Sequence, residues 1–311
     1  MPARILVGSC SWTDPTLVAS GRFYPPQVTS AEARLRHYAE RFDIVEVDST
    51  YYAPPSVRNS RLWVERTPDD FVFNVKAFAW LTGHAAAPAR LPGLLRDRLP
   101  EHARAKRNVY PRDVDGSVLE LVWRQHREAL EPLAAAGKLG AVLFQFPRWF
   151  VRTEQNRAYL RALPAHLPGR PLAVEFRGGG WMDADAAADT LALLEGAGLT
   201  YVGVDEPQGF ADSVPPLTAV TAPLAMVRLH GRNADTWRTR TGAASDRFKY
   251  LYSDAELEEW APRVRELAAQ AETVHVLFNN NYEDWGMRNA RRMAQILGVD
   301  RPRPQTRLQL D

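Results

Sequence analysis

Eight short apolar runs constrain the fold of this chain more than any other feature. They lie at residues 5–8, 44–47, 71–75, 141–144, 172–176, 201–204, 225–229 and 274–278. Near-continuous apolar runs of this length are typical of strands that are buried on both faces, as in parallel sheets. Because helix-period segments separate most of the runs, we predict an α/β protein with one (β/α)8 barrel over residues 1–299. An open doubly wound sheet is the structural alternative, since the number of strands does not prove closure.

The connections between these runs differ in length and in kind. A serine or threonine followed by glutamate three residues later predicts helix starts at Thr29, Ser117 and Ser253. Prolines crowd residues 206–223, so we expect the sixth helix to be short or missing. The connections at 78–116 and 231–252 are too long for a minimal barrel, which places long loops after strands three and seven on the carboxyl-terminal face. Residues 300–311 are predicted to form a frayed C-terminal tail.

The composition is that of an ordinary globular protein. Hydrophobic residues make up 45% of the chain, charged residues make up 24%, and the formal net charge is +2. A charge so near balance predicts neither strong nucleic-acid attraction nor strong membrane attraction by itself. Cys10 is the only cysteine, so no disulfide forms within the chain, and residues 5–7 are too short an apolar run for a signal segment. We therefore expect a cytoplasmic protein without a membrane partner, and the sequence leaves its oligomeric state open.

Polar side chains follow nearly every predicted strand. In chain order they are Glu46, Asp48, Asn74, Lys76, Gln145, Glu175, Arg177, Asp205, Arg228, His230, Arg232, Asn279, Asn280 and Asn281. Polar groups are costly to bury without partners, and their collection at the carboxyl ends of the strands is what an active site on a barrel requires. The alternative is structural, because Glu46 with Lys76 or Glu175 with Arg228 can neutralise each other inside the barrel.

In these same stretches the sequence resembles the YecE-like family, also called the domain of unknown function 72. The matching stretches are GSCSW (8–12), VEVDSTYY (45–52), FNVKA (73–77), GAVLFQFP (140–147), AVEFR (173–177) with Trp181, VRLHGR (227–232), and FNN (278–280) with residues 288–290. The resemblance implies a TIM-like barrel with a site at these residues, but it implies no reaction. Asp48 stands where the family often has asparagine, which adds a negative charge to the site, and Cys10 stands where a small residue is common.

Two sets of residues are candidates for acid–base chemistry on a bound ligand. The expected catalytic residues are Glu46, Lys76, Glu175, Asp205 and His230. The expected substrate-binding residues are Trp12, Asp48, Tyr51, Gln145, Arg177, Trp181, Arg228, Arg232, Asn279 and Asn280. Neighbouring charges can separate the pKa values of such groups into an acid and a base. Lys76 can form a Schiff base, but the favoured interpretation is that it is a charge partner for Glu46 or Glu175.

The loops after strands seven and eight predict an anion site. Barrels often bind phosphate there, and arginine forks with amide donors suit phosphate, sulfate or carboxylate. We expect such an anion near Arg228, His230, Arg232 and the asparagines at 279–281. The seventh loop also holds Trp237, Arg238, Arg240, Arg247, Lys249 and Tyr250. Basic residues interleaved with aromatics can grip a nucleic acid, although a solvated loop that packs its own aromatics is the favoured interpretation.

Three functions remain open on this basis. The leading hypothesis is an enzyme, a hydrolase, isomerase or lyase, that acts by acid–base chemistry on a phosphorylated or carboxylated small molecule. The second is a metal-dependent phosphodiesterase or nuclease, with Glu175, Asp205 and His230 as candidate ligands of a divalent zinc, manganese or magnesium ion. Against a metal, Lys76, Arg177 and Arg228 would already neutralise the acids. The third is a non-catalytic protein that binds a small ligand or a nucleic acid.

Overall fold

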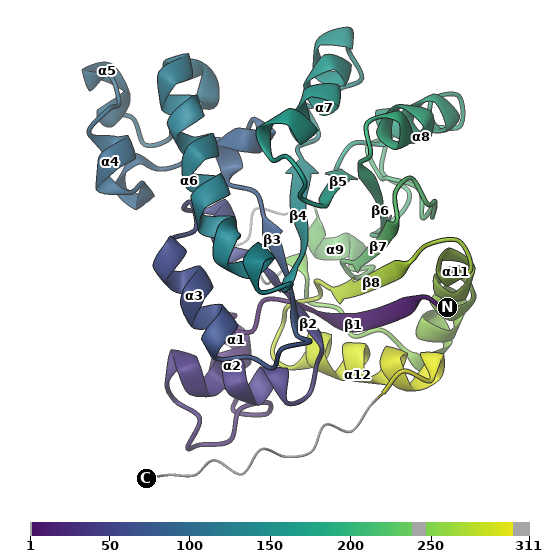
Figure 1. The fold of residues 1–311 in the computed structure, drawn as a ribbon. Coiled ribbons are helices and arrows are strands. Elements are labelled where there is room, and N and C mark those ends of the chain that lie inside the picture. Colours follow the sequence, from purple (N-terminus) through teal and green to yellow (C-terminus); the bar gives the residue numbers. More distant parts are fainter. Residues whose placement is uncertain (1, 238–246, 301–311) are drawn as a thin grey trace.

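The strands form one closed parallel barrel in the computed structural model, which describes residues 2–237 and 247–300 (Figure 1). They are β1 Arg4–Cys10, β2 Ile44–Val47, β3 Val72–Lys76, β4 Leu139–Phe146, β5 Leu172–Phe176, β6 Thr200–Asp205, β7 Leu224–Leu229 and β8 Thr273–Phe278. Each strand pairs in parallel with the next, and β8 pairs with β1 from Thr273 beside Arg4 to Phe278 beside Ser9. The barrel predicted from the eight apolar runs is therefore confirmed, and the open sheet is excluded.

Helices cover most of the outside of the barrel (Figure 1). They are α1 Pro15–Ser20, α2 Ala31–Ala39, α3 Val57–Glu65, α4 Gly93–Arg96, α5 Glu101–Arg104, α6 Gly116–Ala135, α7 Glu154–His166, α8 Ala187–Gly196, α9 Ala234–Trp237, α11 Asp254–Ala268 and α12 Trp285–Leu297. Short 3₁₀ segments lie at Ser49–Tyr51, Ala79–Thr82, Pro88–Arg90, Pro111–Asp113 and Gly179–Trp181. Arg238 and Arg240 of the seventh loop, and the predicted tail except for Asp300, lie outside the described residues.

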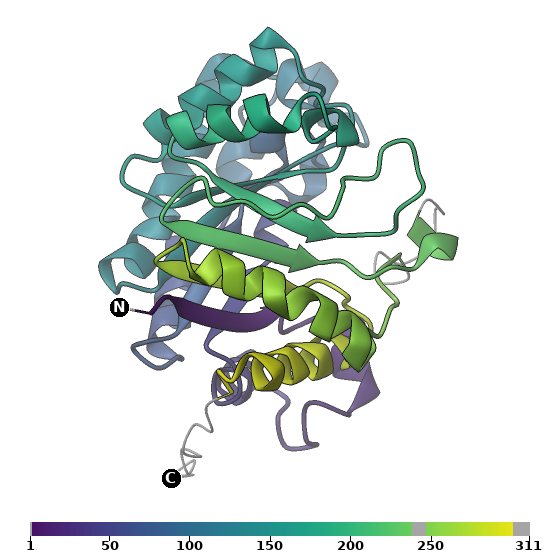
Figure 2. The same ribbon diagram turned by 90° about the vertical axis from the view of Figure 1, so that its right-hand side faces the viewer.

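The flank formed by β6 and β7 carries no helix between the two strands. Residues 206–223 are all described, and they run from β6 to β7 in extended and turn conformations (Figure 2 shows this flank facing the viewer). Gly203 on β6 gives this segment room, because a Cβ there would stand 2.9 Å from the carbonyl oxygen of Leu217. The sixth helix is missing from the described chain, as the prolines predicted.

The helix starts correct two details of the sequence analysis. α11 begins at the predicted capping box, where the Ser253 hydroxyl accepts from the Glu256 N–H and the Glu256 carboxylate accepts from the Ser253 N–H. α2 is capped by Ser30 and not by Thr29, because it is the Ser30 hydroxyl that accepts from the backbone of Ala33. α6 begins at Gly116 after Asp115, so Ser117 lies inside the helix.

The register of the strands decides which side chains point into the barrel. Side chains alternate between the two faces of a strand, and paired residues of neighbouring strands share a face. Gln145 pairs with Glu175, and Val204 pairs with Arg228, on the inner face. Asp205 pairs with Leu229, which is one residue out of step with that inner set and therefore on the outer face. This alternation separates the predicted site residues into two groups.

Candidate functional site

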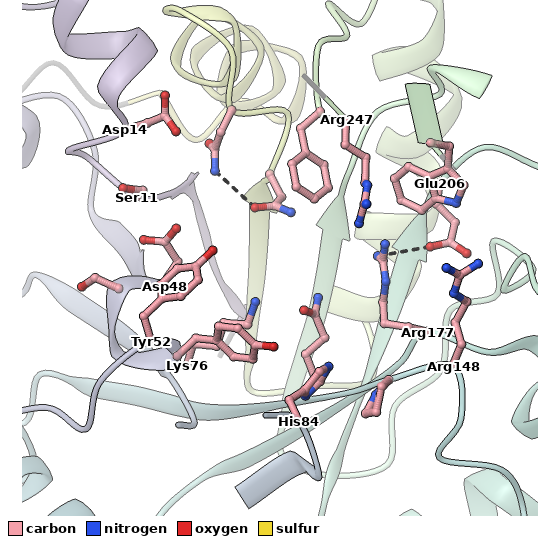
Figure 3. Close-up of a pocket in the computed structure, with 18 of the residues that line it drawn as sticks. Ser11, Asp14, Asp48, Tyr52, Lys76, His84, Arg148, Arg177, Glu206 and Arg247 are labelled. Atoms are coloured by element: carbon pink, nitrogen blue, oxygen red, sulfur yellow. Dashed lines mark hydrogen bonds and ion pairs between the residues drawn. The ribbon is translucent and has the colours of Figure 1, made fainter. Parts of the chain in front are cut away.

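A cavity of about 730 Å³ opens at the carboxyl ends of the strands (Figure 3). Every strand contributes to its lining, from its last residue or from the loop that follows. In strand order the contributions include Ser11, Asp48, Lys76, Gln145, Arg177, Glu206, Trp237 and Asn279. This is the end of the barrel at which the sequence predicted a functional site.

The two sides of the cavity carry opposite chemistry. Asp14, Asp48, Tyr52 and Lys76 lie on one side in Figure 3, and three arginines lie on the other side. The arginines are Arg148, Arg177 and Arg247. A ligand in this cavity would therefore meet guanidinium groups at one end and carboxylate, amine and phenol groups at the other.

Beneath the cavity lies a fully buried ion network centred on Arg228. Its Nε and Nη2 donate to the two oxygens of Glu46 at 2.9 and 2.7 Å, and its Nη1 donates to Glu175. The three side chains are at most 1% exposed. Burial alone would raise the pKa of Glu175, but the positive charge of Arg228 holds it well below the ordinary value. The network supports the cavity from below, and Arg228 has no donor turned toward a ligand.

His230 extends this network as a neutral imidazole. Burial lowers its pKa to about 3, although the charge of Glu175 opposes the shift. The Asn279 amide nitrogen lies 2.9 Å from Nδ1, and the Glu175 carboxylate lies 3.1 Å from Nε2. An amide N–H₂ can only donate, so Nδ1 accepts and the ring proton sits on Nε2, where it bonds Glu175. His230 therefore positions Glu175 and Asn279, and it does not line the cavity.

Arg177 joins the buried network to the cavity wall. Its Nη1 lies 3.4 Å from Glu175 and 3.2 Å from Glu206, and its guanidinium stacks 4.7 Å from the ring centroid of Trp237. The Glu175 oxygen that faces it also accepts from Gln145 at 2.6 Å. These contacts hold Arg177 in one orientation with one face toward the cavity.

Three ionisable groups with shifted pKa values line the opposite side. Burial raises the pKa of Asp48 to about 6, against the charge of Lys76. Burial and the nearby charge of Lys76 lower the pKa of His84 to about 4. Burial lowers the pKa of Lys76 itself, and the charge of Arg228 lowers it further, although Glu46, Glu175 and Asp48 act in the other direction. All three shifts favour the neutral form of the group, and the pKa of Asp48 is the one that suits proton exchange near neutral pH.

The structure brings seven of the predicted site residues together in this cavity. They are Asp48, Tyr51, Lys76, Gln145, Arg177, Asn279 and Asn281. Glu46, Glu175, Arg228 and His230 lie directly below as the buried layer. The expected anion contact with Arg228 needs correction, because Arg228 is buried, pairs with Glu46 and Glu175, and does not line the cavity.

Asp205 and Arg232 lie away from the cavity. Asp205 is on the outer face of β6, where both carboxylate oxygens accept from the Nε of Arg232, at 2.9 and 3.2 Å. Arg232 also pairs with Glu259 at 3.1 Å and Glu256 at 3.6 Å. Gly231 has φ of 90° and turns the chain between His230 and Arg232, which sends the arginine outward. Their predicted roles in catalysis and ligand binding therefore do not fit their positions.

Three further predicted binding residues are part of the packing. Trp12 is 8% exposed and meets Trp63 edge to face. Trp181 is 1% exposed, stacks on Phe176 and donates to the backbone of Phe150. Asn280 donates to the backbone of Tyr250 and to Asn289. None of the three predicted residues lines the cavity among the described residues.

The predicted metal ligands do not converge. Glu175 and His230 bond each other, whereas Asp205 faces outward against Arg232. Within residues 2–237 and 247–300, no three His, Cys, Asp or Glu side chains are arranged to hold a metal ion.

Several cavity residues escaped the sequence analysis. Glu206 lies two residues after Val204, whose side chain points into the barrel, so its own side chain points inward as well. The alternation of side chains along β6 is therefore the signal that could have identified it. Asp14, His84 and Arg148 come from loops after β1, β3 and β4, and no strand pattern marks them. Arg247 was named only among the basic residues of the seventh loop that could grip a nucleic acid, and not as part of the predicted anion site.

Fold and site together define a (β/α)8-barrel protein with a polar cavity at the carboxyl ends of its strands. The chain belongs to the family described as "Protein of unknown function DUF72", whose sequence profile matches residues 6–309. This confirms the family resemblance.

Known proteins resemble the chain over nearly its whole length. The UPF0759 protein YunF of Bacillus subtilis (strain 168) is 32% identical over 300 residues, which cover 95% of each chain. A crystal structure of a DUF72 family protein from Enterococcus faecalis V583 matches with a TM-score of 0.77 and 26% identity, and covers 96% of both chains. One from Thermotoga maritima MSB8 matches with a TM-score of 0.74 and 29% identity, over 95% of this chain and 99% of that one. No helix in the described part of the chain is long and apolar enough to cross a membrane.

Proposed function

We propose that this protein is an enzyme that performs acid–base chemistry on a small molecule carrying a phosphate or carboxylate group. The ligand occupies the cavity at the carboxyl ends of the strands. Its anionic group binds the arginine side, and its reacting part faces Asp48, Lys76 and His84.

The observation that carries this proposal is that Arg247 lines the cavity without a carboxylate partner among the described residues. Within the described residues, no carboxylate oxygen lies within 4.0 Å of its guanidinium, although it lines the cavity. The Arg247 side chain is exposed, and its partial burial and the charges of Arg177 and Arg148 lower its pKa. A guanidinium near two like charges, with no acid partner in the described chain, favours binding of an anion, and its planar fork suits two oxygens of phosphate or carboxylate.

The neighbouring arginines differ in what they can offer. Arg177 is fixed by Glu175 and Glu206 and would add a second, rigid contact. Arg148 is 55% exposed and pairs with Asp212 at 2.5 Å. We therefore assign the anion to Arg247 and Arg177, with Arg148 at the rim.

The reacting end has the groups that acid–base chemistry needs. The Asp48 carboxyl, with its pKa near 6, exchanges a proton close to neutral pH. The Thr82 hydroxyl donates to the Ala79 carbonyl at 3.1 Å and lies 2.8 Å from Nδ1 of His84, and we assign the proton of this second bond to Nδ1. That leaves Nε2 of His84 as a proton acceptor on a ring that lines the cavity.

Calorimetric titration with inorganic phosphate and with ribose 5-phosphate tests the anion site. The proteins are the wild type, Arg247→Gln, and Arg292→Gln as a matched control whose partner Asp254 lies on the surface. We expect Arg247→Gln to weaken binding by about 10- to 100-fold, since a hydrogen bond to a charged group contributes about 1.5–3 kcal/mol. Arg292→Gln should bind as the wild type does.

Three kinds of result would reject the proposal in different ways. Absence of binding by the wild type, or equal binding by the wild type and Arg247→Gln, removes the anion site. Tight binding without turnover of any phosphorylated or carboxylated compound, unaffected by Glu175→Gln, supports the non-catalytic alternative. Cleavage of oligonucleotides that depends on an added divalent metal supports the phosphodiesterase alternative.

A further inference from the structure

Lys76 is a lysine in the cavity wall that, within the described residues, does not form the ion pair with Glu46 or Glu175 predicted from the sequence. It is the last residue of β3 and lines the cavity. Its expected partners, Glu46 and Glu175, are bonded to Arg228 instead. In the described part of the chain, no carboxylate oxygen lies within 4.0 Å of Nζ, which lies over the Tyr51 ring at 4.8 Å from the ring centroid.

The surroundings of this amine favour its neutral form. Burial removes water from the ammonium group, and Arg228 adds a like charge nearby, so the pKa of Lys76 lies below its ordinary value. Glu46, Glu175 and Asp48 are close enough to oppose this shift but do not cancel it. A lysine whose pKa is lowered, and which has no carboxylate partner in the described chain, is a better nucleophile than an ordinary lysine.

We propose that Lys76 forms an imine with the carbonyl carbon of an anionic aldehyde or ketone bound in the cavity. This inference rests on the proposed function, whose arginine side holds the anionic group while Lys76 faces the carbonyl group. It names the substrate class of that site as a carbonyl compound that carries a phosphate or carboxylate.

The bond changes need no oxidant or reductant. The neutral amine attacks the carbonyl carbon, the nitrogen loses a proton, and the carbonyl oxygen gains one to give a carbinolamine. The C–O bond then breaks, the hydroxyl leaves with a further proton as water, and the C=N bond of the imine forms. Nε2 of His84 can take the proton from nitrogen, and the Asp48 carboxyl can give the proton to the departing hydroxyl.

Reductive trapping tests this role, because the chain has four lysines and the three besides Lys76 serve as internal controls. Lys106 pairs with Asp113, and Lys138 is buried against the oxygens of Val64 and Thr67. Lys249 is the matched control, since its Nζ also lies over a tyrosine ring, at 4.6 Å from the centroid of Tyr282, but is solvent-exposed.

The wild-type protein is incubated at pH 7 with sodium cyanoborohydride and either glyceraldehyde 3-phosphate or glyceraldehyde. Peptide mapping by mass spectrometry then gives the labelling rate of each lysine. We expect Lys76 to be labelled at least about tenfold faster than Lys249, because the cavity holds the bound aldehyde with its carbonyl group next to Lys76, whereas Lys249 meets the aldehyde only from solution. Glycerol 3-phosphate, which has no carbonyl group, should suppress labelling of Lys76 and leave Lys249 unchanged.

Two variants complete the experiment. Lys76→Arg should lose the fast-labelled site, and Lys249→Arg should keep it. Labelling of Lys76 no faster than that of Lys249, in protein that binds glycerol 3-phosphate by calorimetry, overturns this inference and leaves the proposed function standing. Equal labelling of Lys76 by both aldehydes, without binding of or protection by glycerol 3-phosphate, overturns the proposed function and the anionic substrate with it.

Discussion

Replacement of Arg228 by methionine should destabilise the protein strongly, in a way that depends on pH. Arg228 donates to two carboxylates that are fully buried, those of Glu46 and Glu175. Without it Glu175 keeps contacts with Gln145 and His230, whereas no other side-chain donor to the Glu46 carboxylate is present in the described chain. The variant therefore leaves one buried carboxylate with no hydrogen bond.

The size of the effect follows from the burial of this network. Removing one partner of a buried ion pair costs about 3–5 kcal/mol, because the remaining charge stays in a medium that solvates it poorly. For a domain of this size, about 1 kcal/mol corresponds to about 2 °C in the unfolding midpoint, so we expect a decrease of about 6–10 °C at pH 7. The surface variant Arg292→Met should unfold as the wild type does, because its partner Asp254 is largely exposed.

The pH dependence gives a second check with a definite sign. In the wild type the pKa of Glu175 is lowered on folding, so its stabilisation is present above the unfolded value of about 4.3 and is lost only as the pH falls further. In the variant the lowering of the Glu175 pKa is reduced, because Arg228 supplies the positive charge behind it, so the difference in stability between the two proteins is largest above about pH 4.3. The deficit in the unfolding midpoint should therefore shrink from about pH 6 to about pH 3 in thermal unfolding followed by circular dichroism. A midpoint within about 2 °C of the wild type at pH 7, or a deficit that is constant with pH, would refute this reasoning.

Three further predictions concern single positions. Gly8→Ala places a Cβ 2.1 Å from the Ile44 carbonyl oxygen, so we expect β1 and β2 to separate at a cost of about 1–3 kcal/mol in thermal unfolding, whereas Gly196→Ala, with open space around it, should cause no loss. Asp48 has a pKa of about 6 and is negatively charged above that pH, so sulfate binding measured by calorimetry should weaken from pH 5 to pH 7. Asp48→Asn should bind sulfate equally at both pH values, and a variant that keeps the wild-type pH dependence contradicts the assignment. Ser253→Ala should lower the free energy of unfolding by about 1 kcal/mol, because it removes the side chain that caps α11. Thr29→Ala should have no such effect because Ser30 caps α2, and equal effects of the two substitutions would contradict the cap positions.

The barrel could be predicted because its strands are buried on both faces. Each strand then appears as an apolar run whatever its neighbours are, and the predicted runs at 44–47 and 172–176 coincide with β2 and β5. The caps of α2 and α6 were predicted one or two residues away, because several residues near a helix start can supply the same hydrogen bond.

The site was predicted less completely, and the reason is geometric. A polar residue at the end of a strand can point into the barrel or out of it, and only the register tells which. Asp205 was chosen although its parity places it outside, and Glu206 was missed although its parity places it inside. For a residue beyond a turn, its place after a strand does not predict on which side of the barrel wall its side chain lies. Arg232 is an example, because the chain turns at Gly231 directly before it. His84 lines the cavity from a long loop, where no periodic pattern exists to mark it.

The central claim is that an anion binds Arg247 and Arg177 in the cavity, with Lys76 facing it. A crystal structure of the protein with glycerol 3-phosphate tests this claim most directly. The account predicts a phosphate group within hydrogen-bond distance of the Arg247 and Arg177 guanidinium groups, and the hydroxyl end of the ligand toward Lys76. A phosphate bound on the outer face beside Arg232, or a cavity in which the ligand touches neither Arg247 nor Arg177, would contradict it.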